Sequence, residues 1–308
     1  MSNILKAHLG LFLVALIYGG NYSIAKVVMD DDYLLPLPFI LLRVSTAMVL
    51  FWMVHLLFIR EKIRRADLGR FFLCGLFGVA VNQMFFFKGL DLTTPINASL
   101  IMTMTPILVL LISALLIGEK ITGRKLLGIA IGALGAALLV AYGQKIRFDQ
   151  EVMMGNAFIF VNATSYGIYL VLVKRLMERY QALTVVKWVF TIGLVMVIPF
   201  GWRGLMATDW LRFTPVIWMS VLYVLLGTTF LAYLLNALAL RVVNPSVVSI
   251  YMYLQPLLAT IIALLMDKDE LDLVKVVAGA AIFAGVYLVS LPARRAGSAA
   301  PARLGGEN

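Results

Sequence analysis

The sequence predicts an all-α membrane protein with ten transmembrane helices, arranged as two inverted repeats of five helices. Three observations lead to this fold class. Hydrophobic residues make up 62% of the 308 residues and charged residues only 14%, whereas soluble domains contain about 45–50% and about 25%. The chain holds ten apolar runs, each near the roughly 20 residues that a bilayer-crossing helix requires. The second half of the chain also repeats the pattern of the first half.

The ten runs are separated by short polar segments, so almost nothing remains for an extramembrane domain. Nothing but Lys6 carries charge ahead of the first run, which also lacks a small-x-small cleavage site. We therefore interpret this run as a retained helix and not as a signal peptide. In the first half the predicted helices span residues 7–29, 36–59, 68–88, 95–117 and 125–142. In the second half they span residues 155–173, 184–201, 215–240, 246–266 and 275–292.

These helices divide the chain into a first repeat over 1–142 and a second repeat over 155–292. Residues 143–154 are expected to form an external connecting loop. Residues 293–308, which are rich in Ala, Gly, Arg and Pro, predict a disordered cytoplasmic tail.

Basic residues predict the orientation in the membrane. If the N-terminus is cytoplasmic, the cytoplasmic segments carry roughly twice as many Lys and Arg residues as the external ones, as the positive-inside rule requires. Both termini are then cytoplasmic, and the membrane is expected to be a bacterial inner or plasma membrane. This bias also explains the net charge of +10, so we expect the lipid bilayer as partner and no nucleic acid.

The two halves are related by a shift of 150 residues, which lays residues 95–140 on residues 245–290 without a gap. The identical pairs include Ser99/Ser249, Met102/Met252 and Pro106/Pro256. Because each half contains an odd number of helices, the second half must enter the membrane in the opposite orientation. Inverted repeats of this kind are common in secondary transporters.

Several stretches resemble a known family. They are the Tyr18-Gly19-Gly20-Asn21 stretch, Arg43 in the second helix, the segment from Asn97-Ala98-Ser99-Leu100 to Pro106, and the Gly118-Glu119-Lys120-Ile121-Thr122 turn. Together with the doubled five-helix unit, they are similar to the EamA-like domains of the ten-helix drug/metabolite transporter superfamily. The resemblance covers all but the tail. It implies a substrate cavity between the halves and export of small metabolites, often amino acids.

Backbone features predict where the helices bend or approach each other. Pro106 and Pro256 lie near the middle of the fourth and ninth helices, where proline removes a backbone hydrogen bond and kinks the helix. Matched kinks would form a cavity wall or a hinge, or they would serve packing alone. Gly19 and Gly20 would let another backbone approach or would loosen the first helix.

Polar and aromatic side chains near mid-depth predict a pocket. Amides and phenols buried in hydrocarbon need partners, which are either each other or a ligand. Arg43 could capture a substrate carboxylate or act in a gate; alternatively it anchors the helix at the interface or bonds to backbone carbonyls. The predicted substrate-binding residues are Tyr18, Asn21, Arg43, Asn82, Thr103, Tyr166, Tyr169, Tyr233 and Tyr253. This composition suits small uncharged or zwitterionic solutes.

The functional prediction is a secondary transporter, with export by alternating access around a midplane cavity. No Walker loop, metal-spaced His/Cys set or nucleophile elbow occurs, so we expect no enzyme activity, no metal and no cofactor. One alternative is a membrane transferase that uses the acidic run Asp30–Asp32, and another is a polytopic scaffold or receptor. The sequence leaves open whether the protein is a monomer or a homodimer.

Overall fold

The computed structural model describes residues 2–29, 33–142, 149–265 and 271–291. Ten helical segments within these ranges are long and apolar enough to cross a membrane. They coincide with the ten predicted helices, which confirms the all-α membrane fold. The expected tail at 293–308 lies outside the described residues. The connecting segment is shorter than predicted, because the sixth transmembrane helix already begins at Gln150.

The first half contains two unbroken transmembrane helices followed by two interrupted ones. α1 (Asn3–Met29) and α2 (Pro36–Phe58) are continuous. The third span runs through η2 (Arg65–Asp67), α3 (Leu68–Gly75), the π-helical η3 (Leu76–Ala80) and α4 (Val81–Leu92). The fourth span is divided into α5 (Pro95–Met102) and α6 (Thr105–Ile117), and α7 (Gly123–Ala141) is the fifth.

The second half repeats this order. α8 (Gln150–Met177) and α9 (Ala182–Met206) are continuous. After the short η4 (Trp210–Arg212), the eighth span comprises α10 (Pro215–Leu222), the π-helical η5 (Tyr223–Leu231) and α11 (Ala232–Leu240). The ninth span comprises α12 (Pro245–Ile250), the 3₁₀ turn η6 (Tyr251–Tyr253) and α13 (Leu254–Leu265). The tenth is α14 (Leu273–Ser290).

Local sequence explains where several of these helices begin and end. Hydroxyl or carboxylate side chains at the N-cap accept the otherwise unpaired backbone N–H of the first turn, as such residues do in general. Gly118 ends α6 with φ of 68°, a left-handed conformation that favours glycine. The side chains that cap a helix in this way belong to Thr94, Thr122, Asp149, Thr214 and Asp272.

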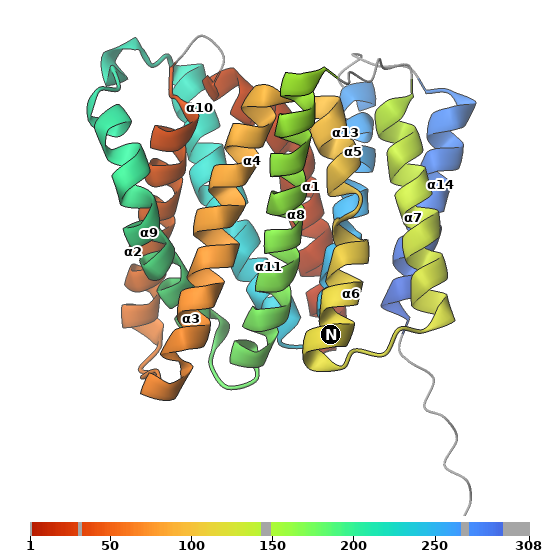
Figure 1. The fold of residues 1–308 in the computed structure, drawn as a ribbon, viewed down its shortest axis with the longest axis horizontal. Helices are drawn as coiled ribbons and strands as arrows, with labels where there is room; N and C mark the ends of the chain where they lie inside the picture. Colours follow the sequence, from red (N-terminus) through yellow and green to blue (C-terminus); the bar gives the residue numbers. More distant parts are fainter. Residues whose placement is uncertain (1, 30–32, 143–148, 266–270, 292–308) are drawn as a thin grey trace, which may run out of the picture.

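The helix contacts obey an internal two-fold symmetry. α2 packs on α9 at one edge of the molecule, and α7 packs on α14 at the other (Figure 1). Between these edges, α4 packs on α8 just as α11 packs on α1, and α6 packs on α8 just as α13 packs on α1. Exchanging the two halves therefore maps each of these contacts onto another or onto itself. All of them join the first half to the second.

The two halves run through the molecule in opposite directions. α1 starts at the lower end in Figure 1, whereas α8 starts at the upper end. α14 returns to the lower end, so the described chain begins and finishes on the same side (Figure 1). This arrangement is the one that two five-helix units of inverted orientation produce.

Glycines hold α7 and α14 close together. A Cβ atom added to Gly285 would lie 2.6 Å from the carbonyl oxygen of Gly128, and one added to Gly135 would lie 2.8 Å from that of Ala278. Without a hydrophobic driving force between helices in lipid, small residues permit the close backbone approach that stabilises such a pair. Gly128 and Gly135 of α7 thus face the partner helix α14 within the same chain.

Candidate functional site

The four interrupted spans lose regular α-helical geometry at the middle of the molecule. The third and eighth spans contain the π-helical segments η3 and η5, and the fourth and ninth are broken just before Pro106 and Pro256. Irregular backbone at membrane depth is tolerated where it is buried in protein or lines a cavity. π-Helical segments within α-helices are also frequent at functional sites.

Tyrosines from the opposite half bond to carbonyl oxygens of these irregular segments. The hydroxyl of Tyr18 donates to the carbonyl of Thr228 in η5 at 3.1 Å, and that of Tyr233 donates to the carbonyl of Gly78 in η3 at 3.3 Å. Each bond therefore ties an irregular segment to the other repeat. The phenol rings are held in place while one side of each side chain still borders a cavity.

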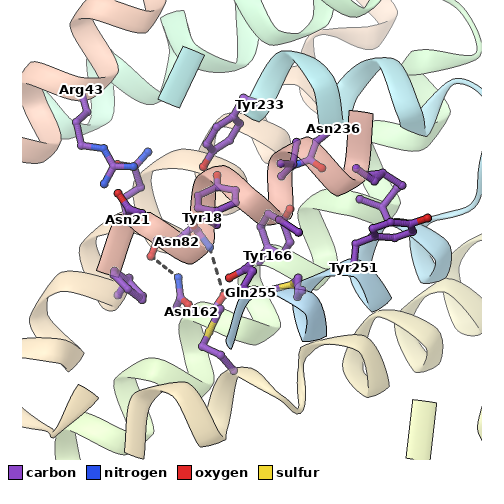
Figure 2. Close-up of a pocket in the computed structure, with 18 of the residues that line it drawn as sticks. Tyr18, Asn21, Arg43, Asn82, Asn162, Tyr166, Tyr233, Asn236, Tyr251 and Gln255 are labelled. Carbon is purple, nitrogen blue, oxygen red and sulfur yellow. Dashed lines mark hydrogen bonds between the residues drawn. The ribbon is translucent and has the colours of Figure 1, made fainter. Parts of the chain in front are cut away.

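A central cavity of about 120 Å³ lies between the two halves. It receives side chains from both repeats (Figure 2), and its lining combines amides and tyrosines with aliphatic residues of α1. Within the described residues its wall contains no Asp or Glu. The polar residues that line it are Tyr18, Asn21, Arg43, Asn82, Gln83, Asn162, Tyr166, Tyr233, Asn236, Tyr251 and Gln255.

Arg43 supplies the charge of this cavity. Its side chain is buried at 7% exposure, and its Nε donates to the Thr229 hydroxyl at 3.0 Å. The guanidinium lies over the rings of Phe39 and Phe87, with its central carbon 5.9 Å and 5.6 Å from their centroids. Among the described residues no carboxylate forms an ion pair with it. Arg43 is therefore a buried cation whose contacts among the described residues are a hydroxyl and two aromatic rings.

Two asparagines link the halves across the cavity wall. The Asn162 side-chain amide donates to the carbonyl oxygen of Asn82 at 2.7 Å, and the Asn82 amide donates back to the Asn162 carbonyl at 3.5 Å (Figure 2). The side-chain oxygens of Asn21 and Asn162 are buried and have no hydrogen-bond partner within the described part of the chain. Buried acceptors of this kind are the groups that a ligand can satisfy.

The structure brings together six of the nine predicted substrate-binding residues. Tyr169 is close by but does not line the cavity, because its ring packs against Gly78, where an added Cβ would lie only 2.3 Å away. Thr103 and Tyr253 border a second chamber beside the cavity, and the Tyr253 hydroxyl donates to the Thr103 carbonyl at 2.8 Å. The six that line the central cavity are Tyr18, Asn21, Arg43, Asn82, Tyr166 and Tyr233.

The predicted hinge residues occupy two kinds of position. Pro106 lies in the first turn of α6, directly after the break, and Pro256 lies in the first turns of α13. Gly19 and Gly20 lie within an uninterrupted α1. A Cβ on Gly19 would lie 3.1 Å from the backbone oxygen of Gln255, so this glycine permits the close approach of α13.

Sequence patterns missed Tyr251 and Gln255 as cavity residues. The predicted face of the ninth helix assumed regular α-helical spacing around Pro256. A 3₁₀ turn has 3.0 residues per turn, whereas an α-helix has 3.6. The side chains within η6, such as Tyr251, and those after it, such as Gln255, therefore point in other directions than regular α-helical spacing predicts. Tyr251 is further oriented by the Nδ1 atom of His8, 2.7 Å from its hydroxyl.

A polar cluster joins the halves at the lower end of the molecule in Figure 1. Glu119, which follows α6, is buried at 8% exposure and pairs with Nζ of Lys125 at 2.6 Å. Ser246 at the start of α12 donates a short hydrogen bond to the same carboxylate. Nearby, Nζ of Lys174 donates to the carbonyl of Leu240 at 2.6 Å. The contact between Ser246 and Glu119 links the two repeats at this end of the molecule.

Comparison with known proteins identifies the family. The sequence pattern of the EamA-like transporter family matches this chain twice, over residues 5–141 and residues 153–291. The chain belongs to the EamA-like transporter family. It is therefore an integral multi-pass membrane protein of a transporter family, as the resemblance in its motifs predicted.

Individual relatives of this EamA-like protein support the same assignment. An "Uncharacterized transporter" of Archaeoglobus fulgidus is 25% identical over 92% of this chain and 97% of its own length. A "Probable terminal-alkyne amino-acid exporter" of Streptantibioticus cattleyicolor is 24% identical over 75% of each chain. A protein of solved crystal structure, 18% identical, superposes with a TM-score of 0.76 over 92% of this chain and 98% of the other, which shows a shared fold.

The acidic run Asp30–Asp32, on which the transferase alternative depended, lies outside the described residues. Within the described ranges, no group of three or more His, Cys, Asp and Glu side chains is placed to hold a metal ion.

Proposed function

We propose that this protein is a secondary transporter that exports small amino-acid-like or other small amphipathic solutes by alternating access around the central cavity. The observation that carries the proposal is Arg43, a buried cation that faces the cavity without an ion-pair partner among the described residues. Burying an unpaired charge is unfavourable, so a solute that brings a carboxylate to this position would be bound.

The remaining polar groups fit the rest of such a solute. The unpartnered oxygens of Asn21 and Asn162 are acceptors for an ammonium or other N–H group. Asn21 and Arg43 lie on the same side of the labelled group, while Asn162 and Tyr166 lie further across it (Figure 2). A zwitterion would thereby meet a cation and neutral acceptors within one cavity, whereas a phosphate would call for several converging basic side chains.

Alternating access is supported by the way the halves meet. The bond between Ser246 and Glu119 crosses the repeat boundary at the lower end, and it would have to open for the cavity to reach that side. In inverted-repeat transporters, access alternates when one repeat rocks against the other around a fixed midplane site. Because no described Asp or Glu lines the cavity, we propose that transport is facilitative or uses a gradient without a carboxylate relay there.

We also propose that the lower end of Figure 1 faces the cytoplasm, because the excess of basic residues in the segments at that end favours this orientation. Single cysteines introduced into a Cys74→Ala background test this orientation in intact cells. Arg212→Cys should react with an impermeant thiol reagent added outside, and Arg64→Cys should react only after the cells are opened. Labelling of position 64 from outside would contradict the orientation and, with it, the direction of export.

Flux measurements in liposomes test the function itself, because they require no second protein. We expect liposomes containing only the full-length wild type to exchange radiolabelled neutral amino acids. Arg43→Gln should reduce that exchange at least tenfold, since a charged hydrogen bond contributes about 1.5–3 kcal/mol. Leu134→Ala on the outward face of α7, where Leu134 is 72% exposed, is the control and should keep wild-type flux. No flux for any member of a broad panel of amino acids and related zwitterions would overturn the proposal.

A further inference from the structure

A second chamber of about 230 Å³ adjoins the central cavity and is the larger of the two. The two spaces share three lining residues, Met102, Met252 and Gln255. Met102 ends α5 and Met252 lies in η6, so the partition between the spaces is formed by the two helix breaks. The chamber thus continues the central cavity past these side chains.

The walls of the second chamber come from three parts of the fold. α5 contributes one wall, the end of α7 a second, and η6 with α13 a third. No lining residue is charged, in contrast to the central cavity with Arg43. Besides the three shared residues, the lining consists of Ser99, Thr103, Ala136, Leu139, Val140, Tyr253, Pro256, Ala259 and Thr260.

Most hydroxyl groups in this lining are already used inside the protein. The Thr103 hydroxyl donates to the carbonyl of Leu100 at 2.6 Å, and that of Thr260 donates to the carbonyl of Pro256 at 3.0 Å. The Tyr253 hydroxyl donates to the carbonyl of Thr103 at 2.8 Å. The chamber therefore offers a ligand mainly hydrocarbon surface.

The partition itself is built from adaptable side chains. Met102 and Met252 are equivalent under the 150-residue shift that relates the repeats, so one methionine comes from each half. Methionine is unbranched and has three rotatable side-chain bonds, which lets it move aside or fit around a ligand without strain. A substrate chain could pass between them without rearrangement of the backbone.

We propose that the second chamber binds the apolar side chain of the transported solute, while its charged head stays in the central cavity. The assignment rests on the function proposed above and narrows it to amphipathic zwitterions with an apolar side chain. Apolar burial contributes about 0.8 kcal/mol per methylene, so each added methylene should tighten binding by about fourfold until the chamber is filled.

A homologous series of amino acids measures this dependence. The probes are alanine, 2-aminobutyrate, norvaline, norleucine and 2-aminooctanoate, and their affinities are compared by competition against flux of the best-transported member in wild-type liposomes. Leu139→Trp fills the chamber from α7, and Ala259→Leu fills it from the opposite wall on α13. Leu138→Trp is the matched control, because its side chain is 42% exposed on the outer face of α7.

We expect affinity in the wild type and in Leu138→Trp to rise along the series. Leu139→Trp and Ala259→Leu should bind alanine as the wild type does, which shows that they are folded, and should lose at least tenfold in affinity for norleucine. Binding of alanine without any gain along the wild-type series, or an unchanged gain in both filled variants, would overturn the assignment alone. Failure of every member to bind the wild type would overturn the proposed function together with it.

Discussion

The fourth and ninth transmembrane spans have the same backbone plan and different side chains at their centres. Each is interrupted just before a proline, and the two prolines are 150 residues apart. At the equivalent positions directly beside the breaks, the first half has Thr103 and the second half has Tyr253. Thr103 accepts with its backbone carbonyl and Tyr253 donates with its phenol, so the two residues bond to each other. Duplication thus preserved the framework, whereas side-chain divergence made the two halves complementary.

The same contrast holds for charge. Arg43 on α2 lines the central cavity. Lys187 lies near the start of the equivalent helix α9, but its Nζ lies 4.1 Å from the centroid of a Trp52 ring and 3.3 Å from Nδ1 of His55. One half therefore contributes a cation to the cavity and the other keeps its cation in an aromatic cluster. A bound solute would therefore meet a cation from one half only, although the helices around it are arranged symmetrically.

The largest expected effect on stability comes from disturbing the close contact between α7 and α14, where the two halves pack against each other. Gly285→Ala would place a Cβ 2.6 Å from the backbone oxygen of Gly128. Overpacking of a close contact typically costs 1–3 kcal/mol, so we expect unfolding free energy to fall by about 2 kcal/mol. Thermal or denaturant unfolding in detergent measures it. Gly123→Ala, with nothing within 4 Å of the added atom, is the control and should leave stability unchanged or slightly raised.

An intermediate effect is expected at the bonds that join symmetric helix pairs. Asn162→Ala removes the 2.7 Å bond from α8 to α4, and Tyr18→Phe removes the 3.1 Å bond from α1 to η5. A lost buried hydrogen bond costs about 1–3 kcal/mol when its partner stays unsatisfied. Both variants should be less stable than the wild type in the absence of substrate, with Asn162→Ala the lower. Equal stability of both variants and the wild type would show that these bonds do not hold the repeats together.

A smaller loss of stability is expected when the hydrogen bond between the breaks of the fourth and ninth spans is removed. Tyr253→Phe removes the hydroxyl that satisfies the Thr103 carbonyl and keeps the ring that packs against Gly132. We expect a loss of about 1 kcal/mol of stability. Tyr287→Phe, at 65% exposure on α14, is the matched control. If the two substitutions lower the melting temperature equally, the bond between the breaks contributes nothing specific.

The sequence predicted the ten helices and their matched breaks, because the features that determine them are strong and local. Apolar runs of membrane-spanning length define the helices, and the duplicated Pro106 and Pro256 indicate matched breaks. The six predicted residues that line the cavity could also be predicted from the sequence, because polar residues inside membrane helices almost always face the protein interior or a water-filled cavity.

The rest depends on backbone geometry that periodicity does not encode. The π-helical segments η3 and η5 and the 3₁₀ turn η6 change the angle between successive side chains. Residues that regular α-helical spacing assigns to one face of these spans therefore lie on another. Thr103, at the break between α5 and α6, and Tyr253, in η6, border the second chamber, and Gln255 lines both spaces. Tyr169 is directed away from the cavity by the lack of a side chain at Gly78, a pairing of distant residues that only the fold reveals.

One measurement tests most directly whether the cation of the first half recognises the substrate. Flux of a neutral amino acid and of its carboxamide, which lacks the carboxylate, is compared in liposomes for the wild type, Arg43→Gln and Lys187→Gln. We expect the wild type and Lys187→Gln to prefer the amino acid by at least tenfold, and Arg43→Gln to lose that preference because the charged bond is gone. A preference that persists in Arg43→Gln would contradict carboxylate binding at Arg43.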